Sequence, residues 1–205
     1  TTTVIYVIKE NKLLLFRKWD LEEVEVMDPG LKRVISLKPT IIPTSLGRHE
    51  RHRFTKANVN IVERLANSLM HFGKKGAKNT GRMGGKKHRS ITIVETALEQ
   101  IHLKTGGNPV EYLVRAIENA APCEDTTRIA YGGVSYHVSV DIAPLRRIDL
   151  ALRFLSEGVR EASFSSQRSI EEVLADDIIF AAKKDIGSFA IKRKNEQERM
   201  AMSSR

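Results

Sequence analysis

The stretch that decides the fold is residues 108–147, NPVEYLVRAIENAAPCEDTTRIAYGGVSYHVSVDIAPLRR. Asn108 can cap the free N–H groups at the start of a helix. Pro109 suits the first helical position, because the backbone N–H that proline lacks would have no partner there, and Glu111 can reach back to the cap. Apolar residues then recur at three- and four-residue spacing, which gathers them on one helix face: Val110, Leu113, Val114 and Ile117. Pro122 ends this predicted helix.

The second half of the stretch changes to a period of two, which predicts a strand with two different faces. Its apolar members are Val134, Tyr136, Val138, Val140 and Ile142. Residues 128–131 are the predicted partner strand, because Gly132 and Gly133 can supply the positive φ angles of a tight turn. An isolated hairpin is marginally stable in water, so we expect residues 138–142 of this 128–142 ribbon to pack on helices and its tip to meet a partner.

The rest of the chain is predicted to be mainly helical. Further helices begin at Thr55, Ser90, Pro144, Ser169 and Ser188, and Thr92 with Glu95 forms a predicted capping box. Residues 1–31 mix apolar runs with charge and predict one or two short strands, while the prolines of residues 31–46 favour an extended segment. The sequence therefore predicts a single, mainly α domain of about six helices with a protruding two-stranded β-hairpin and an irregular N-terminal arm.

Positive charge is concentrated in one part of the chain. The 205 residues carry 34 Lys and Arg against 25 Asp and Glu, a net charge of +9. Residues 32–89 hold fifteen of these cations against only Glu50 and Glu63, whereas the segments on either side are slightly acidic. This concentration predicts a polyanionic partner. The run of residues 48–53, with Lys56 just beyond, is typical of a phosphate-contacting arm rather than an ordinary solvated surface.

Residues 73–89 combine seven cations, five glycines and no acid. Such a segment buries little apolar surface, so we expect it to be flexible alone and to order on a polyanion. Gly76 and Gly81 have the spacing of a phosphate-cradling nucleotide loop, but Arg82 and Met83 stand where that loop needs Lys and then Ser or Thr. The nucleotide-binding interpretation is therefore rejected.

The sequence offers no constellation for catalysis or for a metal. Cys123 is the only cysteine, which excludes an internal disulfide and a Cys-cluster metal site. The six histidines are scattered, and no base is placed to activate Cys123 as a nucleophile. We therefore predict no enzyme activity, no cofactor and no small-molecule substrate. No apolar run could span a bilayer, and residues 4–8 lack the basic leader of a signal peptide, so we expect a soluble intracellular protein.

Several motifs taken together resemble the small-subunit ribosomal protein seven family. The motifs lie in residues 71–89, 106–119, 132–147, 174–176, 181–182, 191–194 and 198–199. The similarity covers about residues 40–205. The N-terminal extension and the helix containing residues 61–65 resemble the archaeal and eukaryotic branch, with the archaeal form the nearer of the two.

The resemblance implies a structural constituent of the small ribosomal subunit in the cytoplasm. It implies that the chain binds the head domain (the 3′ major domain) of the small-subunit ribosomal RNA and helps nucleate head assembly. It further implies that the ribbon lies near the exit transfer-RNA site and the messenger path, beside ribosomal proteins of the head and platform. Residues 73–89 are longer and richer in glycine than the family's usual connection, so RNA contacts there rest on composition alone.

The predicted domain organisation is an N-terminal extension, residues 1–47, followed by a helical RNA-binding domain, residues 48–205. The candidate RNA-binding residues combine the basic clusters with the ribbon tip and the helix starts that the resemblance singles out. They are Arg48, Arg51, Arg53, Lys56, Lys74, Lys75, Lys78, Arg82, Lys86, Lys87, Arg89, Arg115, Arg128, Tyr131, Tyr136, His137, Arg146, Arg147, Lys192, Arg193 and Lys194.

A winged-helix DNA-binding transcription factor is the alternative, because three helices followed by a glycine-turned hairpin is also the order of that motif. A major-groove helix should expose Arg, Asn or Gln. The helix before the hairpin is instead predicted to expose Glu111 and Glu118 beside Arg115 and Asn119. Two acids facing phosphates would repel them, so RNA binding is the favoured interpretation.

Overall fold

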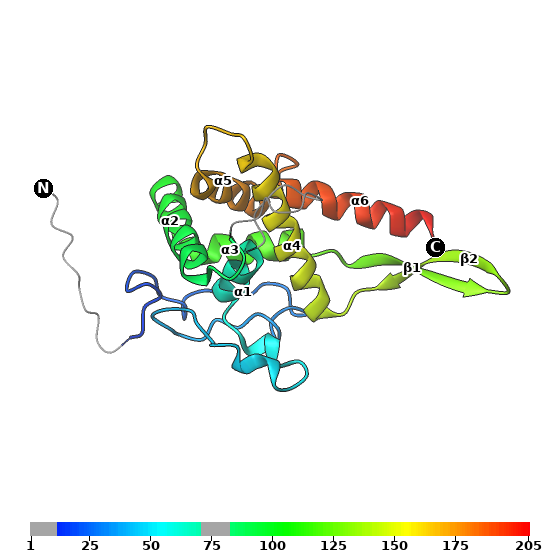
Figure 1. Ribbon diagram of the computed structural model, residues 1–205, viewed down its shortest axis with the longest axis horizontal. Coiled ribbons are helices and arrows are strands. Elements are labelled where there is room, and N and C mark those ends of the chain that lie inside the picture. The colour runs from blue at the N-terminus through cyan, green and yellow to red at the C-terminus, as the bar shows by residue number, and fades with distance from the viewer. Residues whose placement is uncertain (1–11, 71–82) are drawn as a thin grey trace, which may run out of the picture.

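The computed structural model describes residues 12–70 and 83–205, and within them it confirms the predicted mainly α fold with one hairpin (Figure 1). The six α-helices are α1 (Ile61–Leu69), α2 (Lys87–Thr105), α3 (Pro109–Ala120), α4 (Pro144–Ser163), α5 (Ile170–Ala182) and α6 (Phe189–Ser203). The two 3-10 helices are η1 (Arg48–Glu50) and η2 (Thr55–Asn58), and the strands are β1 (Glu124–Tyr131) and β2 (Val134–Asp141). None of the described helices has the length and apolar character needed to cross a membrane.

Helix α3 lies at the centre of the helical body. Its start confirms the predicted cap and proline, because the Asn108 side chain accepts a hydrogen bond from Val110 N at 3.1 Å and Pro109 lies in the first turn. Glu111 pairs with Arg115 instead of reaching back to the cap. It packs against α2, α4, α5 and α6. The apolar face is completely buried: Val110, Leu113, Val114, Ala116, Ile117 and Ala120. Because burying a Leu, Ile or Val side chain contributes about 1.5–3 kcal/mol, this face is the main hydrophobic anchor of the fold.

The N-terminal arm, residues 12–46, packs onto this body although it forms no helix. Its large apolar side chains join the same hydrophobic core as the helices: Leu15, Trp19, Leu21, Leu31 and Ile35. Polar contacts hold it along α3, because Glu118 accepts hydrogen bonds from Met27 N at 2.7 Å and Asp28 N at 3.0 Å. The predicted short strands are wrong for residues 12–31, where only an isolated bridge between Leu15 and Trp19 forms; residues 1–11 lie outside the described part of the chain.

Two helix starts differ from the prediction. Helix α1 is capped by Asn60, whose Oδ1 accepts from Val62 N at 2.9 Å, while Thr55 begins η2 instead. Helix α2 begins at Lys87, one turn before Ser90, without a side-chain cap. The predicted capping box there is wrong because Thr92 lies inside the helix and donates back to His88 O at 3.2 Å.

The hairpin is longer than predicted. The pair Tyr131 and Val134 closes it across Gly132 and Gly133, whose φ angles of 59° and 83° match a two-residue turn of type I′. The ladder continues to the pair Glu124 and Asp141, so β1 begins four residues before the predicted position. The polar run of residues 124–127 gives no strand pattern, and it pairs because β2 supplies a continuous partner.

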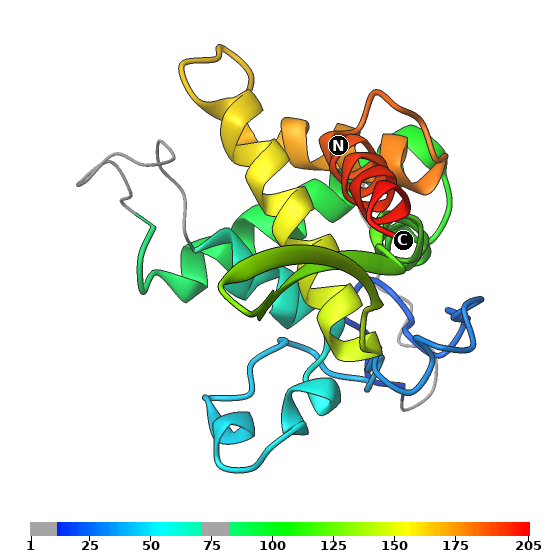
Figure 2. The same ribbon diagram turned by 90° about the vertical axis from the view of Figure 1, so that its right-hand side faces the viewer.

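The apolar face of the ribbon remains open. Val138 is 38% and Val140 is 40% exposed, so the prediction that both pack on helices is wrong, and only Ile142 at the base packs against the core. The reason is geometric: the ribbon projects beyond the helical body, and Figure 2 shows it in front of that body from the side on which it projects. Truncating Val140 would therefore remove little buried surface.

Helix α6 runs beside the ribbon and supports its base. Glu198 accepts a hydrogen bond from Cys123 N at 3.0 Å, and Ser204 O accepts one from Ser139 N at 3.3 Å. The side chain of Arg205 forms an ion pair with Glu124 at the first residue of β1. These contacts explain why a helix with few buried residues is ordered beside the hairpin.

The start of α6 rests on a buried carboxylate of α5. Asp177 Oδ1 accepts a hydrogen bond from Phe189 N at 3.3 Å, whereas Asp177 Oδ2 is buried and has no hydrogen-bond partner among the described residues. Burial raises the pKa of Asp177 to about 6, and the hydrogen bonds from Ser188 and Phe189 oppose the shift without cancelling it. At neutral pH this carboxylate is therefore charged at a cost to stability.

We expect Asp177→Asn to remove a pH dependence of unfolding. The folded pKa lies above the ordinary value, so the protonated carboxyl favours the folded state below that ordinary value and the advantage is lost as pH rises through about 6. Relative to the Asn variant, the wild type should lose about 2 kcal/mol between pH 4 and pH 7, measured by urea unfolding.

Asp176 provides the control for this measurement. Burial alone would raise the pKa of its carboxyl, but ion pairs with Lys104 and Arg168 outweigh burial and lower it. Asp176→Asn should therefore show the opposite trend, with the wild-type advantage present at neutral pH and lost toward acid. Parallel pH curves for the two variants would contradict the assignment to Asp177.

Candidate nucleic-acid interface

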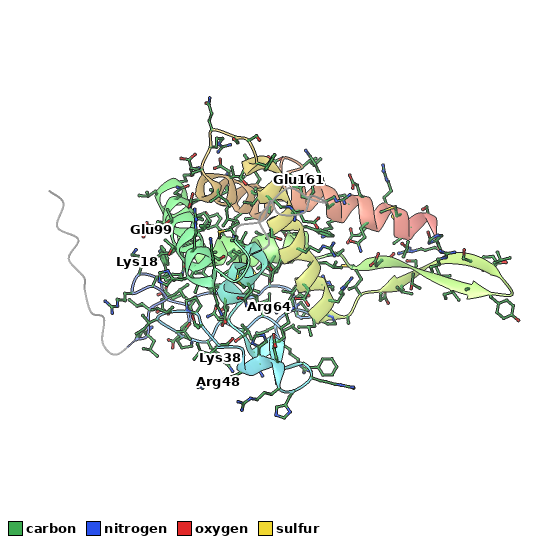
Figure 3. All side chains as sticks on the ribbon, viewed as in Figure 1. Lys18, Lys38, Arg48, Arg64, Glu99 and Glu161 are labelled. Atoms are coloured by element: carbon green, nitrogen blue, oxygen red, sulfur yellow. The ribbon has the colours of Figure 1, made fainter. Side chains whose placement is uncertain are left out.

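The basic arm, residues 47–58, carries the densest group of free cations in the described chain. Arg48, Arg51 and Arg53 are exposed and form no ion pair within residues 12–70 and 83–205. Lys56 is also exposed and pairs with Asp149 of α4 at 2.7 Å. Figure 3 shows Arg48 at the outer edge of the arm and Arg64 farther inside, toward α4. The arm thus presents, at one edge of the molecule, three guanidinium groups that pair with no acid in the described part of the chain.

A buried carboxylate attaches the basic arm to the body. Glu63 of α1 is 2% exposed and accepts hydrogen bonds from Ser45 N at 2.8 Å and Ser45 Oγ at 2.7 Å. It also forms an ion pair with Lys87, the first residue of α2. Burial would raise the pKa of Glu63, but the bonds from Lys87 and Ser45 outweigh burial and lower it. Glu63 therefore stays charged and holds together the segments on either side of residues 71–82.

A cleft of about 360 Å³ opens between the basic arm, α1 and α4. Its polar lining includes His49, Lys56, Arg64, Asp149 and Arg153. Arg64 is 2% exposed and donates to Asp149 Oδ1 at 3.0 Å, while its Nε is buried without a hydrogen-bond partner among the described residues. Lys56 and Arg64 share Asp149, and Arg153 pairs with Glu157, so these three cations face two carboxylates. The remaining positive charge suits a phosphate group, which accepts charge-assisted hydrogen bonds.

The segment after the basic arm contributes cations at the start of α2. Lys86 and Arg89 are exposed and make no ion pair with described residues, whereas Lys87 is held by Glu63. The other predicted contacts of this segment lie outside the described residues: Lys74, Lys75, Lys78 and Arg82. The predicted flexibility of residues 73–89 likewise concerns mostly residues outside the described part.

The ribbon brings its candidate residues together at a distance from the basic arm (Figure 1). Arg128 and His137 are directly opposite each other across the two strands. Tyr131 is 82% and Tyr136 is 55% exposed. The ribbon therefore offers a second surface, on which exposed tyrosine side chains lie on the same two strands as the exposed Arg128.

Four further candidates, besides Lys56 and Lys87, are already engaged inside the protein. Arg147 is only 15% exposed, donates to Asp28 Oδ2 at 3.0 Å and to Pro122 O at 3.2 Å, and so ties the N-terminal arm to the base of the ribbon. Lys194 donates to Asn119 O at 2.8 Å, and Arg115 and Arg193 pair with acids on their own helices. Arg146 and Lys192 are exposed without an ion pair in the described chain. RNA contacts at all of the candidate positions remain predictions.

Sequence reasoning did not single out Glu63, Arg64 or Phe54 as parts of this surface. Glu63 carried a usable signal, because it is one of only two acids in the basic residues 32–89. Phe54 is 78% exposed in the left-handed backbone region, with a φ of 63°, which costs a non-glycine residue on the order of 1–2 kcal/mol. No local pattern predicts that conformation.

Comparison with known proteins identifies the family of this chain. The family model described as ribosomal protein S7p/S5e matches residues 31–205. The chain belongs to this ribosomal protein family. One relative is small ribosomal subunit protein uS7 of Cenarchaeum symbiosum, 62% identical over 195 residues, which are 95% of this chain and 98% of the relative.

Two further relatives agree with this assignment to the S7p/S5e family. Proteins of the same name from Methanothermobacter thermautotrophicus and Methanosphaera stadtmanae are 47% and 46% identical. Each alignment spans 93% of this chain, with 98% and 97% of the respective relative. The resemblance deduced from the motifs, including its archaeal character, is therefore confirmed.

Membership of the S7p/S5e family makes the chain a structural ribosomal protein and not an enzyme. The described residues contain no group of three or more His, Cys, Asp or Glu that could hold a metal ion. The winged-helix alternative also fails on geometry. Glu118 is covered by the N-terminal arm, and Asn119 donates to Ala181 O and Ala182 O, so the expectation that both face solvent is wrong and α3 cannot enter a groove.

We expect Glu63→Gln to destabilise the fold by about 1–3 kcal/mol. The change leaves the Lys87 ammonium without its carboxylate and weakens the hydrogen bonds that Ser45 donates to residue 63. Urea unfolding at neutral pH measures the loss. Glu111→Gln is the matched control: Glu111 forms an exposed pair with Arg115 on α3, and its loss should cost about 0.5 kcal/mol or less. Equal losses for the two variants would show that Glu63 has no special anchoring role.

Proposed function

We propose that the chain binds the head domain of the small-subunit ribosomal RNA as a structural constituent of the small ribosomal subunit. The name that the relatives share supports the subunit. The observation that carries RNA binding is the basic arm, in which Arg48, Arg51 and Arg53 are exposed and unpaired within the described residues. Three exposed guanidinium groups beside a cationic cleft can neutralise phosphates without first breaking an ion pair to another described residue.

The mode of binding follows from the chemistry of the surface. A-form RNA hides its base edges in a deep, narrow major groove, so proteins recognise it mainly through phosphates, 2′-hydroxyls and shape. Arginine forks and lysines on an irregular arm fit that task, because they require no helix or strand to enter a groove. The residues before and after the undescribed segment, held together by Glu63 and Lys87, extend the same basic surface.

The ribbon is proposed to serve a second purpose, which is contact with the exit-site transfer RNA, the messenger path and neighbouring proteins of the head and platform. Support comes from its projection beyond the body and from an apolar face that the described chain leaves open, with Ile129 49%, Tyr131 82% and Tyr136 55% exposed. Exposed apolar surface of this kind is typical of an interaction site.

The first prediction of this proposal concerns the salt dependence of binding to a head-domain ribosomal RNA transcript. The triple variant Arg48→Gln, Arg51→Gln and Arg53→Gln should lower the slope of log affinity against log salt by about 2 to 3, because each phosphate contact contributes about 0.7–0.9. Filter binding across a salt series measures the slope.

The matched control removes three cations that are paired with acids on other parts of the body. Lys18 pairs with Glu99, and Lys104 and Arg168 both pair with Asp176. Replacing these three with Gln removes the same charge and should leave the slope within about one unit of wild type. If both triple variants flatten the slope equally, net charge rather than the basic arm drives binding.

The second prediction separates the ribbon tip from the stability of the domain. Deleting residues 129–131 and 134–136 joins Arg128 to His137 through Gly132 and Gly133 and keeps the native pairing of that rung. Because the removed residues are exposed, the melting temperature and the binding of head-domain RNA should stay close to wild type. Assembled subunits should show impaired retention of exit-site transfer RNA.

Retention is measured by binding labelled deacylated transfer RNA to reconstituted subunits with and without the deletion. Unfolding of the shortened protein would place the tip in the core. Normal transfer-RNA retention by correctly assembled subunits would remove the proposed role of the ribbon.

A further inference from the structure

Phe54 occupies an unusual position in the basic arm. Phe54 is 78% exposed, and it lies outside the hydrophobic core that includes Phe16 and Trp19 of the N-terminal arm. Its φ of 63° lies in the left-handed region, which residues other than glycine seldom adopt. The protein therefore holds a large apolar ring in water on a strained backbone, a combination that folding alone does not favour.

The conformation at Phe54 is held by hydrogen bonds on both sides of the residue. Thr55 Oγ1 donates to His52 O at 2.7 Å and also bonds to His49 O. The carbonyl of Phe54 accepts from Ala57 N at 3.1 Å, which begins η2. These bonds close the turn around Phe54 and keep its backbone fixed. The exposed ring is thus carried by an ordered turn.

The surroundings of the ring restrict what it can bind. Residues 51–60 contain two arginines, a histidine and a lysine, with no acid among them. A protein partner that buried the ring in an apolar pocket would also have to desolvate Arg51 and Arg53, which have no counter-charge among the described residues. The ring needs a flat apolar partner, and the cations need a negative charge. An RNA nucleotide supplies both, a flat base for the ring and a phosphate for the cations.

We infer that Phe54 stacks on an unpaired base of the RNA that the basic arm binds, while Arg51, Arg53 and Lys56 contact the phosphates next to that base. The inference rests on the proposed function. The base must be unpaired, because bases inside an A-form duplex are not accessible to an aromatic side chain, whereas bases in loops and bulges can splay out and stack. Phe54 thus adds a local recognition element to an otherwise electrostatic surface.

Stacking and charge predict different effects in the same binding assay. Phe54→Ala should weaken binding of the head-domain transcript about 5- to 100-fold, the range expected for losing one stacked base, without changing the salt slope. Phe54→Tyr should bind close to wild type, because it keeps the ring. Phe164→Ala, which removes another exposed aromatic side chain at the end of α4, is the control and should have no effect.

Fluorescence gives a readout that does not depend on affinity. Trp19 is the only tryptophan and is 7% exposed, so it should report little of an event at the basic arm. A Phe54→Trp variant should show fluorescence quenching when the head-domain transcript is added, as base stacking on an indole requires. A Phe164→Trp variant should show no such change under the same conditions.

The outcomes separate this inference from the proposed function. If the wild type fails to bind the head-domain transcript, the proposed function itself is wrong. If the wild type binds but Phe54→Ala binds equally well and Phe54→Trp is not quenched, only the stacking inference is overturned. If Phe54→Ala binds naked RNA normally but enters subunits poorly when the other ribosomal proteins are present, the ring meets a protein and the stacking inference is likewise overturned.

Discussion

Complete burial of the apolar face of α3 is the constraint on which the rest of the structure depends. Four other helices pack against this helix, and the N-terminal arm is bonded to its outer side through Glu118. A helix enclosed in this way cannot also be a recognition element. The surfaces left for binding are therefore the parts that do not pack against α3, namely the basic arm and the ribbon.

The protein divides its cations between two tasks. Arg64, Lys87, Arg147 and Lys194 join segments that are far apart in the chain, and each has an acid or a carbonyl as its partner. Arg48, Arg51 and Arg53 have no such partner among the described residues and face solvent. Net charge alone does not distinguish the two groups. The first group joins parts of the isolated protein, whereas the second group is available to a polyanion, as we propose.

Local signals in the sequence were enough to predict much of the fold. The cap and proline at Asn108 and Pro109, the paired glycines of the ribbon and the capping serines at 169 and 188 act within a few residues, and all were confirmed. The contact between Asp28 and Arg147 joins residues 119 positions apart, so no local pattern contains it. The exposed Val138 and Val140 were misjudged because alternation predicts two different faces without telling what covers them.

The packing of the N-terminal arm has a consequence for the order of synthesis. Leu15, Trp19 and Leu21 leave the ribosome about a hundred residues before the centre of α3, against which their core is completed. At roughly 5–20 residues per second, this separation leaves them without their final partners for about 5–20 seconds. During that interval the nascent chain exposes an apolar segment followed by a strongly basic one, a combination suited to premature association with nucleic acid or to capture by a chaperone. The newly made protein is thus most vulnerable before its central helix has emerged.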